Sequence, residues 1–294
     1  MAKDTKTTKQ KSPAAKQEQK KELVRRDDGT IELNITVPAA TVQKERGKIE
    51  DALVKGIELP GFRKGMAPRD LALKKISEEK IREELLREVI TNEYRKAVEK
   101  HKLQPVINPQ IHIEAFENGQ DLQFTAEIAE EPKVELGDYK KAIKDVSAKG
   151  KIVTEKGKEP QKPSIDAVIA AGMSQVTVKI PNVIIEREVS RLLSQVIDEV
   201  KQLGMTLENY LDSKKISVEQ LREEYKNRAE RDIKLEFFLR KVADEEKITV
   251  TADDITAAIA KIEDKDQQEE IKKNPYLVAS IIRQQKTIDF LTQI

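Results

Sequence analysis

The chain has 294 residues, of which 36% are charged and only 4% are aromatic, and it contains no tryptophan and no cysteine. This length allows two domains with a sizeable core, and the composition is typical of long, solvated helices rather than of a compact enzyme. The absence of cysteine excludes a disulfide framework, a thiol nucleophile and a thiolate metal site.

Positive charge is concentrated at the start of the chain. Residues 1–26 hold nine Lys or Arg against three acidic residues, and the remainder carries a net charge of −5. Because this segment has almost no bulky apolar side chains, we expect 1–26 to be a disordered basic tail. No apolar segment follows its charges, and no segment reaches the roughly 18 apolar residues of a membrane span. We therefore expect a cytoplasmic protein that does not contact membranes.

An α+β domain is predicted over residues 27–139. Apolar residues alternate along its strands, Ser77 suits the N-cap of its longest helix, and Asn118-Gly119 signals a hairpin turn. These elements form a small antiparallel sheet with helices on one side. In chain order they are a strand at 30–37, helices at 41–57, 69–76 and 78–101, and hairpin strands at 111–115 and 122–128.

A tight loop joins the first two of these helices. Gly61 and Gly65 adopt backbone angles that other residues avoid, and Pro68 suits the first turn of the following helix. We therefore predict an ordered loop between two helices.

The tip of this loop holds one large apolar ring and two cations, which are Phe62, Arg63 and Lys64. An apolar anchor beside positive charge suits docking onto an acidic or ribonucleoprotein surface better than it suits catalysis. The alternative is an ordinary helix connection in which Phe62 folds into the core.

Residues 140–180 differ from both flanks. Lys, Gly, Glu and Pro dominate residues 140–163, which indicates a linker. Residues 164–180 are mildly apolar, and their secondary structure is ambiguous. A strand at 176–180 is one candidate.

Residues 181–294 are predicted to be helical throughout. Apolar residues recur there at helical spacing, and no fixed repeat is evident. The predicted helix starts, caps and breaks are Pro181, Gly204, Ser217 with Gln220, Thr251 with Asp254, and Pro275.

Catalytic chemistry has little support in this sequence. The two histidines, His101 and His112, lie near a helix end and on a strand, and without cysteine they do not form a usual zinc site. No motif supports a Ser-His-Asp arrangement or a phosphate-binding loop. We predict no catalytic residue, no metal and no cofactor.

The loop and its setting resemble trigger factor, the bacterial chaperone family that sits at the ribosomal peptide exit. The ribosome-binding signature of that family, Gly-Phe-Arg-x-Gly-x-x-Pro between two helices, is met by Gly61, Phe62, Arg63, Gly65 and Pro68, with Lys64 between them. The last third also resembles the family's carboxy-terminal domain, at residues 181–193, 207–211, 250–255 and 287–291. The resemblance covers roughly residues 25–139 and 181–294.

The resemblance implies an ATP-independent chaperone. Its amino-terminal domain would dock through the loop on protein and RNA near the exit tunnel, and its helical domain would shield apolar segments of unfolded or nascent chains. Most members carry a prolyl isomerase domain between these two parts. Here the 140–180 linker replaces it and contains no Phe, Tyr or Trp, so we expect no enzymatic activity.

The client-binding surface is predicted only as a region, because apolar stripes at helical spacing usually face inward. A weak homodimer is left open. The candidate contacts are Ile184, Ile185, Leu192, Met205, Leu207, Tyr210, Tyr276, Leu277, Ile281 and Phe290.

Three other interpretations fit parts of the sequence. The helical part also resembles the chaperone core of SurA, a periplasmic carrier, but the missing signal peptide and the Gly-Phe-Arg loop argue against it. A nucleic-acid-binding protein acting through its lysine-rich tail predicts that the tail rather than the loop carries binding. A degenerate isomerase requires residues 140–180 to fold into a pocket.

Overall fold

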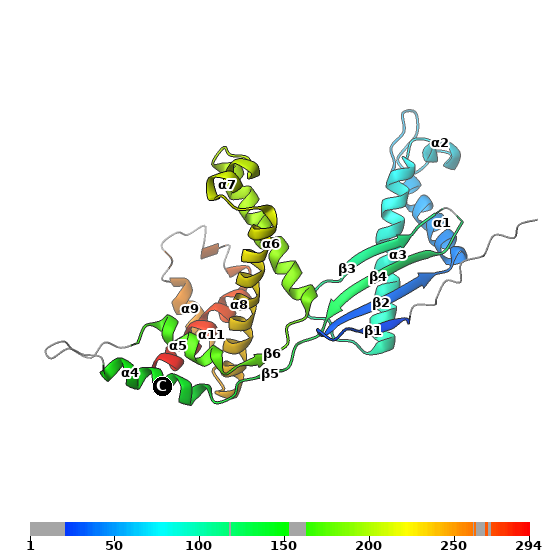
Figure 1. The fold of residues 1–294 in the computed structure, drawn as a ribbon. Coiled ribbons are helices and arrows are strands. Elements are labelled where there is room, and N and C mark those ends of the chain that lie inside the picture. Colours follow the sequence, from blue (N-terminus) through cyan, green and yellow to red (C-terminus); the bar gives the residue numbers. More distant parts are fainter. Residues whose placement is uncertain (1–20, 118, 153–162, 261, 263–267, 270–271) are drawn as a thin grey trace, which may run out of the picture. The chain divides into compact units, whose positions relative to one another are not determined.

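A computed structural model describes residues 21–117, 119–152, 163–260, 262, 268–269 and 272–294 (Figure 1). Its contacts divide the chain into two units. The described residues of the first lie within 1–24, 32–102 and 111–126, and those of the second within 25–31, 103–110 and 127–294. Of the predicted basic tail, residues 1–20 lie outside the described residues. The predicted domain boundary at residue 139 stays a prediction.

A four-stranded antiparallel sheet is built from β1 (Leu23–Arg25), β2 (Thr30–Val37), β3 (Gln110–Ala115) and β4 (Leu122–Ala129), in the order β1-β2-β4-β3. The predicted strand and hairpin are confirmed, and Gly119 in the hairpin turn has a φ of +81°. Asn118 lies outside the described residues.

Strand β1 corrects the predicted end of the tail. Residues 23–25 were expected to be disordered, but they pair with β2, and the Asn34 N–H donates to the Glu22 carbonyl at 2.8 Å. The short apolar pair Leu23-Val24 is half-buried in this position, which the charged composition around it concealed.

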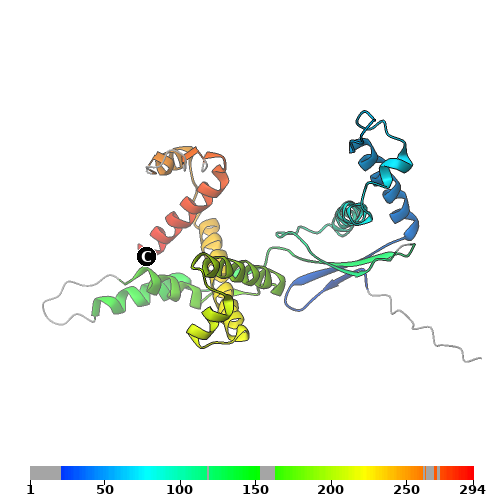
Figure 2. The same ribbon diagram turned by 90° about the horizontal axis from the view of Figure 1, so that it is seen from above.

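The helices of the first unit are α1 (Ala39–Gly56), α2 (Arg69–Leu73) and α3 (Glu78–His101), and α1 and α3 lie on one face of the sheet (Figures 1 and 2). Ser77 caps α3 as predicted, since its side chain accepts a hydrogen bond from the Lys80 N–H at 3.3 Å. The sheet and helices share one core, formed by Val37, Val42, Leu85, Val89, Leu122 and Phe124.

The second unit is mainly helical, and α6 and α8 form an antiparallel pair joined through α7 (Figure 1). The capping box of Ser217 and Gln220 is present, and Thr251 and Asp254 exchange hydrogen bonds at the start of α9, so both predicted caps are confirmed. The helices are α4 (Tyr139–Ile152), α5 (Ile165–Ser174), α6 (Asn182–Gln202), α7 (Leu207–Lys214), α8 (Val218–Glu245), α9 (Ala252–Ala260) and α11 (Pro275–Thr292).

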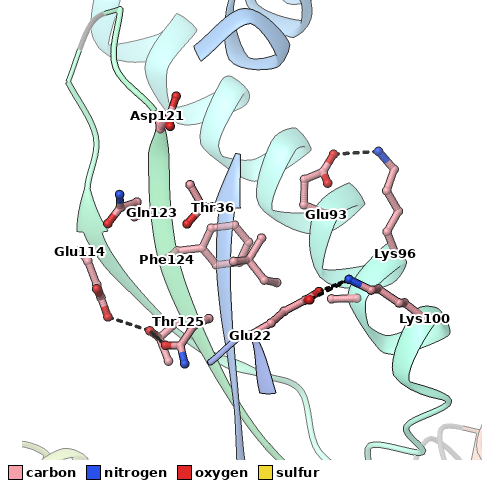
Figure 3. A pocket seen from close by; sticks show the side chains of 13 residues that line it. Glu22, Thr36, Glu93, Lys96, Lys100, Glu114, Asp121, Gln123, Phe124 and Thr125 are labelled. Carbon is pink, nitrogen blue, oxygen red and sulfur yellow. Dashed lines mark hydrogen bonds and ion pairs between the residues drawn. The ribbon is translucent and has the colours of Figure 1, made fainter. Parts of the chain in front are cut away.

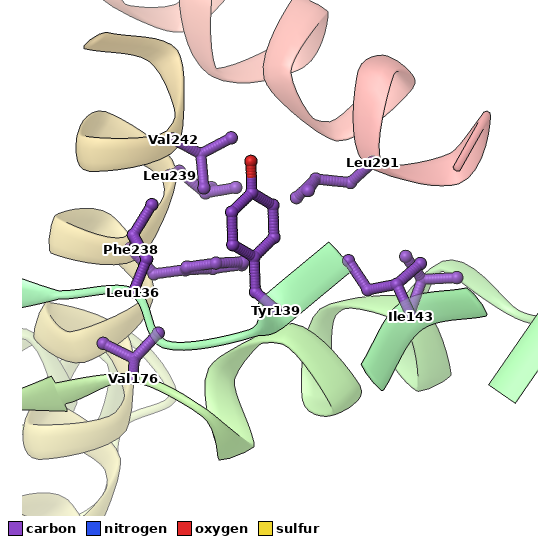
Figure 4. Close-up of a cluster of buried hydrophobic side chains, with 9 residues drawn as sticks. Leu136, Tyr139, Ile143, Val176, Phe238, Leu239, Val242 and Leu291 are labelled. Carbon is purple, nitrogen blue, oxygen red and sulfur yellow. The ribbon is translucent and has the colours of Figure 1, made fainter. Parts of the chain in front are cut away.

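The expected linker at 140–180 is wrong for its described residues. Helices α4 and α5 both contribute to the largest core of the second unit, where Tyr139, Ile143 and Val168 meet Phe238 and other residues of α8 and α11 (Figure 4). The widely spaced apolar residues of the lysine-rich α4 are enough to cover one side of a helix pair, although the composition of this stretch is that of a linker. Strand β6 (Thr177–Val178) pairs with β5 (Val134–Glu135), close to the strand considered at 176–180.

Candidate functional site

The candidate site is the loop between α1 and α2, and its first half is a tight turn over residues 59–62. The Phe62 N–H donates to the Leu59 carbonyl at 3.0 Å. Pro60 occupies the second position of this turn, and Gly61 occupies the third with a φ of +85°. A type II turn favours proline and requires a positive φ at these two positions, so the sequence Leu-Pro-Gly-Phe specifies the turn by itself.

The second half repeats the same arrangement over residues 63–66. The Met66 N–H donates to the Arg63 carbonyl at 2.9 Å, and Gly65, again in third position, has a φ of +75°. The Gly65 N–H also reaches back to the Ile57 carbonyl at 3.4 Å. Two consecutive turns therefore fix the residues between the glycines, as the ordered-loop prediction required.

Ion pairs tie the base of the loop to its neighbouring helices. Arg46 on α1 contacts Glu50 at 2.8 Å and Glu78 at the start of α3 at 2.7 Å. Arg69, the first residue of α2, contacts Glu50 at 2.9 Å and Asp51 at 3.0 Å. The hydrogen bond to Glu50, together with that to Glu78, raises the pKa of Arg46. Because Arg69 is paired with Glu50 and Asp51 at the base of the loop, the positive charge at the tip comes from Arg63 and Lys64.

The tip presents the three residues that the sequence singled out. The Phe62 side chain is 43% exposed, so the alternative in which it folds into the core does not hold in this structure. Arg63 and Lys64 are exposed beside it. The Lys64 Nζ lies 3.9 Å from a Glu58 carboxylate oxygen, and the Lys64 side chain is still 61% exposed.

Met66 was not among the predicted site residues, yet it is 73% exposed, more than Phe62. The sequence signal for this exposure was the position of Met66 directly after Gly65. A side chain at the end of a tight surface turn has few neighbouring residues to cover it. The loop therefore offers two apolar side chains, Phe62 and Met66, with Arg63 and Lys64 between them in sequence.

The candidate client contacts fall into three groups. Ile185 and Leu192 are wrong, because both are buried between α6 and α8 in a shared core. Tyr276, Leu277 and Ile281, on the first turns of α11, are exposed, and Tyr276 reaches 87%. The remaining candidates, which are half-buried, are Ile184, Met205, Leu207, Tyr210 and Phe290.

Two exposed apolar residues near the α6–α7–α8 connections were missed. Leu203 follows α6 and Val218 begins α8, and both are exposed. Each lies at a helix end, where a side chain has no neighbouring turn on one side. Helical periodicity predicts which face of a helix is buried, but it does not predict exposure at a helix end.

A hollow of about 880 Å³ in the first unit lies beside β2 and α3 (Figure 3). Its charged lining is already paired, since Glu22 contacts Lys100 and Glu93 contacts Lys96. In the described part of the chain, no group of three or more His, Cys, Asp or Glu residues is placed to hold a metal. The two histidines lie on separate elements, at the end of α3 and on β3.

Comparison with known proteins agrees with these features. The family model described as "Bacterial trigger factor protein (TF)" matches residues 19–161, and the one described as "Bacterial trigger factor protein (TF) C-terminus" matches residues 148–293. The chain belongs to the trigger factor family. The two matches overlap, so no further domain lies between the trigger factor amino- and carboxy-terminal parts in this chain.

Individual trigger factors are similar over a shorter span. The trigger factor of Macrococcus caseolyticus is 39% identical over 108 residues, which are 37% of this chain and 25% of that protein. The trigger factor of Natranaerobius thermophilus is 36% identical over 107 residues, which are 34% of this chain and 24% of that protein. The chain thus spans about a quarter of the length of the curated relatives it matches.

A solved trigger factor has the same fold. It is described under "Promiscuous Substrate Recognition in Folding and Assembly Activities of the Trigger Factor Chaperone" and aligns with a TM-score of 0.56 and 16% identity. The alignment covers 93% of this chain and 99% of the solved one. Within the described residues, no helix has the length and apolar character needed to cross a membrane.

Proposed function

We propose that this protein is an ATP-independent, ribosome-associated chaperone that docks near the peptide exit tunnel and shields hydrophobic segments of nascent chains. Membership of the trigger factor family supports the chaperone role. The observation that carries the docking role is the double turn at 59–66, which holds Phe62, Arg63 and Lys64 exposed at a fixed tip. The protein acts without prolyl isomerase activity.

Docking uses two kinds of contact. Phe62 enters an apolar niche on the ribosome, and Met66, four residues further along the same loop, adds a second apolar contact. Arg63 and Lys64 pair with acidic side chains or with RNA phosphates around that niche. The tail at 1–20 adds salt-dependent attraction to ribosomal RNA through its excess of lysines. Because the turns fix the loop beforehand, little conformational entropy is lost on docking.

Clients are held by the apolar surface of the helical unit. Tyr276, Leu277 and Ile281 form an exposed apolar group on α11, and exposed apolar groups of this kind mark interaction sites. The solved relative is described as recognising substrates promiscuously, which small, separate apolar groups allow. A client leaves when folding buries its own apolar residues, so release requires no nucleotide.

Co-sedimentation with bacterial ribosomes at two salt concentrations tests the docking role. We expect the triple variant Phe62→Ala, Arg63→Ala, Lys64→Ala to stay in the supernatant, and a chain lacking residues 1–20, which spares β1, to pellet at low and at high salt. The matched control is Arg187→Ala, Lys201→Ala, Leu203→Ala, which removes two exposed cations and one exposed apolar side chain from α6 and its C-cap. This control should pellet like the unaltered protein.

The outcomes separate the proposed function from the nucleic-acid alternative. If the loop variant pellets normally and the tail deletion does not, then the tail carries the interaction and the proposed docking mode is wrong. If every variant pellets except the loop variant, the loop is the docking site. Met66→Ser alone should weaken ribosome binding less than the triple variant, because it removes one apolar contact and no charge.

A further inference from the structure

Helix α4 is strongly basic in a chain that is otherwise acidic. Its 14 residues include five lysines, one aspartate and no arginine, a net charge of +4. Residues 1–26 carry +6 and the whole chain carries +1, so everything outside these two segments carries −9. Positive charge gathered on one element of an acidic protein is the electrostatic signature of an anionic partner.

The apolar side of α4 is committed to the interior of the second unit. Tyr139 and Ile143 lie in the core that Figure 4 shows, against residues of α8 and α11. Ala142 and Val146 are half-buried, and no large apolar side chain is exposed over residues 139–148. The outward side of the helix is therefore polar, and its positive charge comes from lysine.

The lysines of α4 differ in whether the protein already neutralises them. The Lys140 Nζ lies 2.7 Å from a Glu246 carboxylate oxygen, which also accepts a hydrogen bond from the Tyr139 hydroxyl at 2.8 Å. Lys141 and Lys144 are both exposed, and no acidic side chain in the described part of the chain lies within ion-pair distance of either.

Lys141 and Lys144 are neighbours on the helix surface, because residues three apart lie about 5–6 Å from each other at Cβ. Other lysines of the same unit are compensated, since Lys241, Lys272 and Lys286 each contact a carboxylate. The pair on α4 therefore presents two uncompensated charges side by side.

We propose that the exposed face of α4 around Lys141 and Lys144 binds the phosphate backbone of RNA without recognising its sequence. Lysine is a compact point charge that suits phosphate, and each phosphate that it neutralises releases counterions from the nucleic acid. Sequence recognition has no support here. Tyr139, the one aromatic residue of α4, is buried, and the helix has no arginine to make a bidentate contact with a base edge.

Other anionic partners fit α4 less well. A helix that binds an anionic membrane inserts an apolar face, whereas the large apolar residues of α4 lie in the core. A carboxylate-bearing peptide is recognised best by the planar fork of arginine, which α4 lacks. The choice of RNA among polyphosphates rests on the proposed function, which places this chain on the ribosome. The phosphate contact itself rests on the charges of α4.

Fluorescence anisotropy of a labelled single-stranded RNA of about 20 nucleotides, titrated with the whole chain at about 50 and 200 mM salt, tests the contact. The variant Lys141→Gln, Lys144→Gln removes both charges and keeps a side chain of similar helix propensity. We expect its Kd to rise several-fold at low salt. The slope of the logarithm of affinity against that of salt concentration should become shallower by about 0.7 for each lysine removed.

The matched control is Lys179→Gln, Lys201→Gln, which removes the same two charges from exposed positions elsewhere in the second unit. It should leave the Kd and the salt slope unaltered. Lys141→Arg, Lys144→Arg keeps both charges and should bind RNA like the unaltered protein. In a chain lacking residues 1–20, which removes the lysines of the tail, the α4 variant should still differ from the control.

Equal RNA binding by the α4 variant and its control would overturn the proposal. So would a loss of binding to phosphatidylserine-containing vesicles in the α4 variant while its RNA affinity stays unchanged. Free RNA replaces the ribosome in this assay, so its result is separate from the docking test of the loop. If the loop variant pellets normally with ribosomes and the α4 variant loses RNA affinity, the proposed docking mode is wrong and the RNA contact stands.

Discussion

A Cβ atom on Gly65 would lie 2.9 Å from the carbonyl oxygen of Lys55 in the last turn of α1. Real Cβ atoms do not approach a backbone oxygen this closely, and the φ of Gly65 is also positive. The loop at 59–66 therefore touches the end of its preceding helix at a point where only glycine fits.

Gly65→Ala should lower ribosome affinity and destabilise the first unit by about 1–2 kcal/mol, because the loop must move away from Lys55 or accept a strained backbone. Gly61→Ala is the matched comparison, since Gly61 has a similar positive φ but no atom within 4 Å of its Cβ position. Co-sedimentation and thermal unfolding of both variants separate the two causes. Equal effects would mean that the close approach to Lys55 is unimportant.

Leu277→Ser with Ile281→Ser should reduce the suppression of client aggregation, because both exposed side chains lie in the proposed client surface on α11. Val106→Ser with Ile165→Ser is the control, since those two residues are exposed to a similar extent elsewhere in the second unit. Light scattering of an aggregating client without ATP measures the effect. The client surface is misplaced if both pairs act alike.

Gly172→Ala should lower the free energy of unfolding of the second unit by about 1–3 kcal/mol. The new methyl group would lie 2.6 Å from the Phe238 ring, which is fully buried and has no room to retreat. Helix propensity favours alanine by about 1 kcal/mol and opposes the clash without cancelling it. Urea denaturation measures the change.

Gly47→Ala in α1 serves as the control for this substitution, because its Cβ position has no neighbour within 4 Å and the change should stabilise the helix. Adding Phe238→Leu to Gly172→Ala should recover part of the loss by making room for the methyl group. A stabilising effect of Gly172→Ala alone would show that α5 shifts freely on α8.

Asp254 gives the protein a pH-dependent contribution to stability. A hydrogen bond from Lys286, and others from Thr251, lower the pKa of its carboxyl from 3.8 to about 2. The unfolded state therefore takes up this proton first as pH falls, so the contribution is present above pH 3.8 and is lost as pH falls to about 2. Asp254→Asn should flatten stability against pH in this interval only, as acid titrations of both proteins followed by circular dichroism will show.

Refolding of a proline-limited protein should proceed no faster with catalytic amounts of this chain. The residues between Tyr139 and Pro181 include no Phe, Tyr or Trp to line an isomerase pocket. In their described part, apolar side chains such as Ile143 and Val168 are committed to the core with α8. A known prolyl isomerase in a parallel reaction is the positive control, and acceleration by this chain would contradict the prediction.

The sequence by itself determined the features that depend on local backbone chemistry. Proline and glycine set the turns of the loop at 59–66, Ser77 and Ser217 capped their helices, and alternation predicted β2 and the hairpin. Each of these signals acts within a few residues, so no distant contact was needed to interpret it. The loop residues Gly61 to Pro68 were found in this way.

Only the tertiary structure decided which apolar residues are buried and which segments join the core. Ile185 and Ile281 both fit a helical stripe, but the first lies between α6 and α8 and the second faces solvent. Helix α4 has the composition of a linker, and the apolar stretch of α5 gave no clear assignment, yet both pack against α8 and α11 in one core. Burial depends on residues far apart in the chain, and the periodicity of one segment does not contain that information.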